Sequence, residues 1–130
     1  MAALSDYAEK LLLDFLMTTG TATRPTNWYV ALYTSAPSDS GGGTEVSAGG
    51  YARQSVSFNA ASSPGGTTSN SGDVSFTASG GDYGTVTHMG IFDASSSGNL
   101  LWHGALTASK TVADGDTLTF AAGNIDLTMA

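Results

Sequence analysis

The spacing of apolar residues changes once along the chain, near residue 20, and this change constrains the fold more than any other feature. Before it, apolar side chains recur at the i, i+3, i+4, i+7 spacing of a helix; after it, they recur at the two-residue period of strands. The residues that carry the helical spacing are Leu4, Tyr7, Ala8, Leu11, Leu12, Phe15 and Leu16. The sequence therefore predicts one short amphipathic helix followed by strands.

The predicted helix covers about residues 5–18. Ser5 is placed to cap its amino end, Asp6 and Glu9 lie near the positive end of the helix dipole, and Gly20 is placed just after its carboxyl end. A strong apolar stripe on such a helix has to be covered by another apolar surface. We expect the sandwich of the same subunit to cover it, and a neighbouring subunit is the alternative.

Strand-like segments occupy most of the remaining chain. Residues 27–34 are rich in β-formers and apolar on both faces, which is typical of a central strand. Residues 51–58 alternate, with Arg53 on one face and Val56 and Phe58 on the other. Turn residues separate the later segments. Further short strands are expected at residues 74–77, 85–93, 100–105, 117–121 and 125–129.

These segments predict an all-β fold, a jelly-roll-like β-sandwich with the helix at its start. A chain of 130 residues suits a single domain over residues 1–130. Two Gly- and Ser-rich segments, about 35–50 and 59–72, are predicted as long loops that contact neighbouring subunits. The residues expected to be mainly buried are Trp28, Val30, Leu32, Val56, Phe58, Val74, Phe76, Val86, Phe92, Leu100, Trp102, Leu118 and Phe120.

Charged residues are few and mostly acidic. The sequence holds 4 Lys and Arg against 11 Asp and Glu, which gives a net charge of −7. Nucleic acids and anionic membrane surfaces are bound by clusters of Lys and Arg, so neither is expected as a partner. The chain contains no cysteine, and its fold must be held by packing alone. Its first residues lack the features of a signal peptide, so we expect synthesis in the cytoplasm without export.

Few side chains could carry chemistry. His88 and His103 fall on successive strands, and a hairpin centred at Ser96 places the two imidazoles on opposite faces of the sheet. Two such histidines without a third ligand make a poor zinc site. Asp114-Gly115-Asp116 could offer oxygens to a calcium ion, but it lacks the spacing of an EF-hand loop, and a turn is the preferred interpretation.

The other candidates have simpler explanations. Ser95-Ser96-Ser97 lies in a turn, and no Gly-x-Ser-x-Gly motif marks an activated serine. Gly41-Gly42-Gly43 and Gly65-Gly66 are followed by no Lys-Ser or Lys-Thr, so we interpret them as flexible loop residues rather than phosphate cradles. Other carboxylates lie singly on loops, and no feature of the sequence indicates that they act in pairs. They are Asp39, Glu45, Asp73 and Asp82. We therefore expect no catalytic, cofactor-binding or metal-binding residues, and no cofactor.

Aromatic residues could serve as a platform for stacking sugars or as core and interface anchors. Their two-residue spacing favours the second interpretation. The aromatic residues concerned are Trp28, Tyr29, Tyr33, Tyr51, Phe92 and Trp102.

Several segments resemble a group of short phage and prophage virion proteins of similar length. The resemblance rests on residues 25–34, on Glu-Val-Ser at 45–47, on Gly-Tyr-Ala-Arg-Gln at 50–54, on His-Met-Gly-Ile-Phe-Asp at 88–93 and on the closing pattern of residues 112–123. Together with the helix at the start, it covers nearly the whole chain. These motifs are structural rather than catalytic.

The resemblance implies a non-enzymatic virion structural protein made in the host cytoplasm. Such proteins are described as tail fibre-like or as head decoration (cement) proteins. A fibre normally needs an elongated shaft, so we favour a decoration protein that bridges capsid subunits and binds the major capsid protein. The expected assembly is a homo-oligomer, a dimer or a trimer. The alternative is a tail fibre or tail-tip component that binds a host receptor or carbohydrate.

Overall fold

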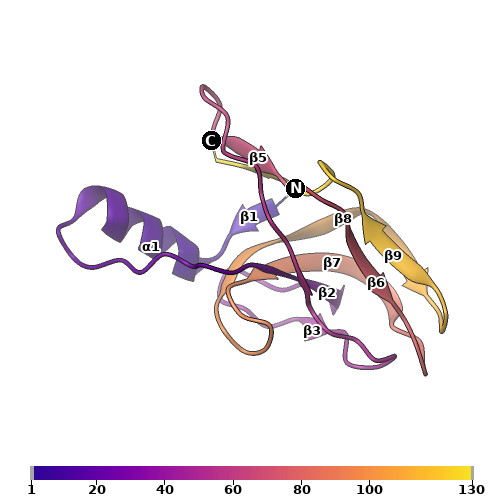
Figure 1. The fold of residues 1–130 in the computed structure, drawn as a ribbon. Helices are drawn as coiled ribbons and strands as arrows, with labels where there is room; N and C mark the ends of the chain where they lie inside the picture. Colours follow the sequence, from indigo (N-terminus) through magenta and orange to yellow (C-terminus); the bar gives the residue numbers. More distant parts are fainter. Residues whose placement is uncertain (1, 130) are drawn as a thin grey trace.

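The computed structural model describes residues 2–129, which form one helix and ten strands in that range (Figure 1). The elements in chain order are β1 (Ala2–Leu4), α1 (Asp6–Met17), β2 (Tyr29–Ser35), β3 (Thr44–Glu45), β4 (Gln54–Ser55), β5 (Thr67–Ser69), β6 (Val74–Thr77), β7 (Gly84–Phe92), β8 (Leu100–Val112), β9 (Thr117–Phe120) and β10 (Asp126–Thr128). The predicted all-β class with a short N-terminal helix is confirmed.

Six of the strands form one antiparallel sheet, the main sheet, in the order β1-β8-β7-β2-β3, with β4 also paired to β2. The segment predicted as a central strand, now β2, does lie inside this sheet. Its residues Val30, Ala31 and Leu32 have no exposed surface, so both of its faces are covered. Two antiparallel ribbons, β6–β9 and β5–β10, complete the fold.

The larger apolar cluster lies between the main sheet and the β6–β9 ribbon, and this arrangement makes the molecule a sandwich (Figure 1). Leu32 and Ile91 belong to it from the sheet, and Phe76 and Leu118 from the ribbon. The Phe76 ring stacks on Tyr51, with ring centroids 6.2 Å apart. We call the side of the main sheet that faces this ribbon its inner face.

A smaller cluster covers the outer face of the main sheet. It consists of Ala31, Tyr33, Phe92 and Leu100, all of them buried. Tyr33 and Ala31 alternate with Leu32 along β2, so the two clusters lie on opposite sides of one strand.

A β-bulge between β7 and β8 overturns the prediction for the two histidines. Phe92 pairs with Leu100, as in a hairpin centred at Ser96, but the next pair is Ile91 with Trp102. Leu101 is therefore an extra residue on β8, and it shifts the register by one. His88 and His103 consequently lie on the same face of the sheet, where opposite faces were predicted.

Helix α1 begins as predicted and ends differently. The Ser5 hydroxyl caps it by accepting a hydrogen bond from the Ala8 amide at 3.1 Å. At the other end, Thr18 is the C-cap, and its hydroxyl donates to the Asp14 carbonyl and accepts from the Gly20 amide. Gly20 does not adopt a positive φ, so its predicted role as the C′ glycine is wrong.

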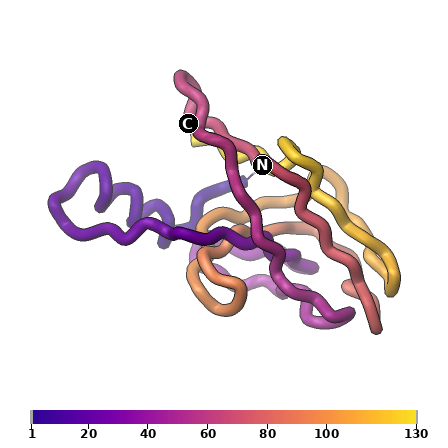
Figure 2. The backbone as a smooth tube through the Cα atoms, viewed as in Figure 1, coloured from indigo at the N-terminus to yellow at the C-terminus, as the bar shows by residue number. Residues whose placement is uncertain are grey.

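The prediction that the sandwich of the same subunit covers the helix is also wrong. Within α1 only Ala8 is buried, and the helix points away from the sheets as an arm (Figure 2). We call residues 2–18 the arm. A segment of coil leads from the end of the arm back to β2 (Figure 2).

Four further expectations need correction. The alternating segment 51–58 pairs with β2 only at Gln54 and Ser55, because Arg53 and Tyr51 are held by side-chain hydrogen bonds instead. Strand β8 continues seven residues beyond position 105, to Val112. The predicted loops at 35–50 and 59–72 contain β3 and β5. Predicted core residues that are only partly buried are Trp28, Phe58, Trp102 and Phe120.

Candidate interaction surface

The base of the arm is fixed to the main sheet. Strand β1 pairs with β8, and Ser5 continues the contact, its amide donating to the Leu101 carbonyl at 2.9 Å and its hydroxyl to the Leu100 carbonyl. The Asp6 amide donates to the carbonyl of Asp39 at 2.9 Å. His103 Nε2 lies 2.7 Å from Asp39 Oδ1. These contacts orient α1, so the arm is a defined projection and not a loose tail.

The far end of α1 is apolar and exposed. Leu13, Phe15, Leu16 and Met17 are 61%, 68%, 68% and 76% exposed, whereas Ala8 at the base is 5% exposed. The large apolar side chains at this end are therefore the most exposed ones in the helix. We call these four residues the arm tip. Contiguous exposed apolar side chains of this kind mark interaction sites on soluble proteins.

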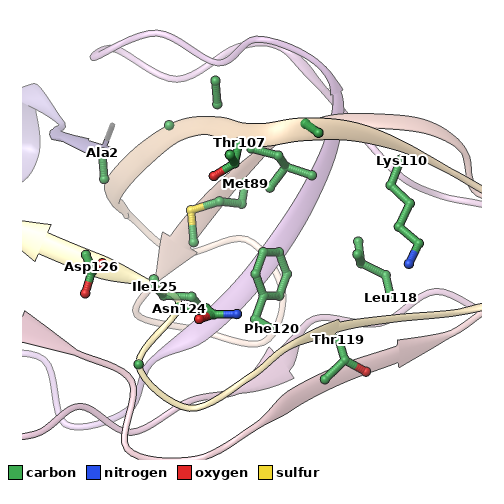
Figure 3. Close-up of a pocket in the computed structure, with 15 residues that line it drawn as sticks. Ala2, Met89, Thr107, Lys110, Leu118, Thr119, Phe120, Asn124, Ile125 and Asp126 are labelled. Atoms are coloured by element: carbon green, nitrogen blue, oxygen red, sulfur yellow. The ribbon is translucent and has the colours of Figure 1, made fainter.

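A groove of about 590 Å³ opens between β8 and the β9–β10 segment (Figure 3). Met89, Leu118 and Ile125 form its buried apolar floor, and Phe120 borders it. In Figure 3 the Lys110 side chain reaches from β8 toward Leu118. The groove exists because the β6–β9 ribbon leaves part of β8 uncovered. It is the second apolar surface without a covering element in the described chain.

On the outer face, Arg53 ties three segments together. Its guanidinium donates to both carboxylate oxygens of Glu45 at 2.9 Å, and to the carbonyls of Ala94 and Ser97 at 3.0 and 2.8 Å. It also lies over the Phe92 ring, 3.7 Å from the ring centroid. We call Arg53, Glu45 and Tyr51 the outer polar cluster.

The protonation of this cluster follows from its contacts. Burial opposes ionisation of Glu45, but hydrogen bonds from Arg53 and Tyr51 outweigh it and hold the pKa of the Glu45 carboxyl below its usual value. Burial, together with the bond to Glu45, raises the pKa of the Tyr51 hydroxyl. The Tyr51 hydroxyl donates to Glu45 at 2.7 Å and accepts from the Leu32 amide. All three side chains have hydrogen-bond partners within the chain, so the cluster stabilises the fold.

The histidines and the loop carboxylates are held within the chain. His88 Nδ1 lies 2.8 Å from the Thr87 hydroxyl, and His103 meets Asp39 as described. Asp73 accepts from the Ala122 amide at 2.9 Å, and Asp82 from the Asp114 amide at 2.8 Å. Within residues 2–129, no three His, Asp or Glu side chains are grouped so as to hold a metal ion.

The Asp114-Gly115-Asp116 segment forms a turn. The Asp116 amide donates to the Ala113 carbonyl, and Asp114 accepts from the Gly80 amide at 3.0 Å. Gly115 has φ +87°, a value that side-chain-bearing residues rarely adopt. The predicted turn is therefore present, and both carboxylates accept hydrogen bonds from backbone amides.

Two features of the surface escaped the sequence analysis. Leu13 and Met17 complete the arm tip, and the run Phe15-Leu16-Met17 was the available signal, since three consecutive residues cannot share one helix face. Lys110 and Leu106 line the groove, for which the sequence carries no signal because the groove depends on how two β layers meet.

Comparison with known proteins adds one finding. A family model described as "Podophage GP4 fiber I protein gp80" matches residues 3–128 of the chain. Comparison with curated proteins found no match to the chain. Along the part of the chain that the structure describes, no helix is long and apolar enough to cross a membrane.

Proposed function

This chain belongs to the family of the podophage GP4 fiber I protein gp80, and from that premise we propose that it is a tail-fibre subunit that attaches to neighbouring subunits through helix α1. Membership makes it a structural, non-enzymatic component of the phage virion. The observation that carries the proposal is the arm tip, whose Phe15, Leu16 and Met17 are each more than two-thirds exposed.

Several features of the arm support an attachment role. Burying a large apolar side chain is worth about 1.5–3 kcal/mol, so four exposed ones are a large unused contribution. The contacts of Ser5 and Asp6 hold the helix in one orientation before any partner arrives. A preorganised surface binds more tightly than a mobile one, because less conformational freedom is lost on binding. The expected partners are other tail or fibre subunits, including further copies in a dimer or trimer.

The family match favours the tail-fibre alternative over the head-decoration interpretation. The description of the family names a fibre, and it mentions no head or capsid. A contact with the major capsid protein accordingly has less support than a contact with fibre subunits. Binding of a host carbohydrate by an aromatic platform also has little support, since Tyr33 and Phe92 are buried and the Tyr51 hydroxyl is bonded within the outer polar cluster.

Phage particles that lack the protein separate the two virion roles. A fibre subunit predicts particles with normal heat resistance and impaired adsorption to host cells. Particles that adsorb normally and burst more readily on heating would instead establish a decoration role and overturn the proposal. Reconstruction of the virion by electron microscopy then locates the protein on tail or head.

Incorporation into particles tests the arm itself. The double variant Phe15→Ser/Leu16→Ser should fold and yet be depleted from purified virions at least tenfold, measured by quantitative mass spectrometry. The matched control, Phe15→Leu/Leu16→Met, keeps the tip apolar and should be incorporated normally. Equal incorporation of all three proteins would contradict attachment through α1.

A further inference from the structure

The arm tip is apolar over more than half of the helix circumference, and the Lys10–Asp14 ion pair lies on the remaining side. Successive residues of a helix are rotated by about 100°, so Phe15, Leu16 and Met17 span more than half of its circumference. Leu13 extends the apolar surface between Leu16 and Met17, and all four side chains are more than 60% exposed. This surface is wider than the apolar stripe of roughly 100° that an ordinary surface helix buries against one layer. A flat partner surface would cover only part of this tip, whereas a groove can enclose it.

The groove beside β8 has the size and the lining to receive such a tip. Its volume of about 590 Å³ lies in the range of about 300–1,000 Å³ that holds a drug-sized molecule, which leaves room for a few large side chains. Its floor of Met89, Leu118 and Ile125 is apolar. Thr107 on β8 and Asn124 in the turn before β10 lie at its rim. Figure 3 shows these residues facing one space from two layers of the fold.

Helix α1 of the same chain does not fill this groove. Ala2, at the start of β1, lines the groove, but no residue of α1 does. The helix begins at Asp6, beyond the other end of β1, and extends away from the sandwich (Figure 1). One chain therefore presents an exposed apolar helix end and a groove with an apolar floor and a polar rim, and the two do not meet within it.

Charge supports the same pairing. The last turn of α1 contains no basic residue, so the negative end of the helix dipole is uncompensated beside the arm tip. Of the four cationic side chains, Lys10 pairs with Asp14 and Arg53 with Glu45. Both Lys110 and Asp126 line the groove, and Figure 3 shows them at opposite sides of it. Lys110 has no ion pair among the described residues, so the negative helix end would be favoured on the Lys110 side, away from Asp126.

The available area also favours a groove over a second helix. With about 200 Å² for a fully exposed large side chain, the four residues of the arm tip expose roughly 500–600 Å². A stable interface buries about 800 Å² on each partner. Two crossed helices would bury only a part of that tip area. A groove contacts the tip from two sides, so it covers more of that area than a crossed helix does, and its rim can contact the rest of the helix.

We propose that the arm tip of one copy docks in the groove beside β8 of a second copy, with Lys110 of the second copy beside the carboxyl end of the inserted helix. This inference rests on the proposed attachment through α1 and names its partner surface. Because arm and groove are different surfaces, the contact is heterologous, so copies join head to tail in a closed ring or an open chain. Each copy then covers the exposed apolar surface of the next.

Site-specific disulfide formation tests the pairing, since the chain has no cysteine of its own. Leu16→Cys protein is mixed with Thr107→Cys protein at high concentration and oxidised with glutathione disulfide. The expected result is a crosslinked heterodimer in at least fivefold excess over a mixture of Leu16→Cys with Ser96→Cys, whose cysteine lies on the exposed turn after β7. A yield equal to this control would overturn the proposal. So would Leu16→Cys crosslinking chiefly to itself, which would indicate helix-to-helix packing.

A charge exchange provides a second readout. Lys110→Glu should weaken self-association at least threefold in sedimentation equilibrium, and Met17→Lys in the same chain should restore it. A Lys110→Glu protein that associates normally would contradict the pairing. If these tests fail while the Phe15→Ser/Leu16→Ser protein is still missing from virions, attachment through α1 stands and only its partner surface is wrong.

Discussion

The sandwich and the arm use the same apolar residue types for opposite purposes. Phe76, Leu32 and Ile91 in the sandwich are at most 1% exposed, whereas Phe15 and Leu16 in the arm are each 68% exposed. The sandwich buries its apolar side chains within one chain, and the arm keeps its own for another molecule. Stability of the single chain therefore explains the sequence of the sandwich and leaves the sequence of the arm tip unexplained.

Removal of a core aromatic should have the largest effect. Phe76 is 1% exposed and contacts the rings of Tyr51 and Phe120. Phe76→Ala should lower the free energy of unfolding by about 4–5 kcal/mol, because it loses apolar burial and leaves a cavity. Urea denaturation measures the change. A loss below about 1 kcal/mol would mean that the ribbon does not form the core with the sheet.

Substitution of Arg53 should have the next largest effect on the free energy of unfolding. Arg53→Ala leaves Glu45 without its bidentate partner and frees the carbonyls of Ala94 and Ser97. Because Arg53 is 9% exposed and Glu45 27%, we expect a loss of about 3 kcal/mol, at the low end for a buried pair. Arg53→Lys keeps the charge without the planar fork and should recover less than half of it. Full recovery by lysine would mean that charge alone matters there.

The outer polar cluster should also make the free energy of unfolding depend on pH in the acid range. The folded-state pKa of Glu45 lies below its unfolded value of about 4.3, so its stabilisation is complete above that pH and is lost as the pH falls through the folded pKa. At pH 7, Glu45→Gln should cost about 2 kcal/mol. The difference between the two proteins should shrink below about pH 4. Denaturation curves at pH 7, 5 and 3 measure it, and a constant difference would contradict the assignment.

Ser5 connects the arm to the sandwich, and its substitution should have a smaller effect on the free energy of unfolding. Ser5→Ala removes the helix cap and the bond to the Leu100 carbonyl, at a cost of about 1–2 kcal/mol. Ser5→Thr retains a capping hydroxyl and should lose less. Hydrogen exchange should show faster exchange in α1 and unchanged protection in β2 and β7. Equal acceleration in both regions would mean that the arm and the sandwich unfold as one unit.

The arm tip itself should have almost no effect on stability. Leu16→Ser should change the free energy of unfolding by less than about 0.5 kcal/mol at low concentration, where the protein is monomeric. It should nonetheless weaken self-association, while Leu16→Met preserves it. Thermal unfolding at two protein concentrations separates these effects. A large loss of stability in the monomer would place Leu16 in the fold of its own chain.

Local chemistry made most of the elements predictable. The capping residue Ser5, the two-faced apolar run of β2 and the alternation of β6 are all properties of neighbouring residues, and each appears where expected. The segment around Arg53 shows the limit of this reasoning. Its alternation predicted a strand, but hydrogen bonds to distant carbonyls fix it instead.

Features that depend on register and on packing between layers were out of reach. The extra residue Leu101 moves His103 to the face of His88, and no local signal marks it. The groove forms where a 13-residue β8 runs past a shorter ribbon, so its lining draws on segments far apart in the sequence. Exposure of the arm tip was likewise not predicted, because the helical stripe alone does not say which molecule covers it.

The connection of the arm to the body also has a mechanical consequence. A pull on the far end of α1 reaches the same sheet along two paths, through β1 at its edge and through the coil that leads to β2 near its middle, with β8 and β7 between them. The first path holds by a three-residue ladder and the Ser5 contacts, and the second by the full length of β2. Under tension the edge strand should yield first, while β2 keeps the chain attached. In a fibre strained by flow or by contact with a cell, such a joint extends before the sandwich itself is unravelled.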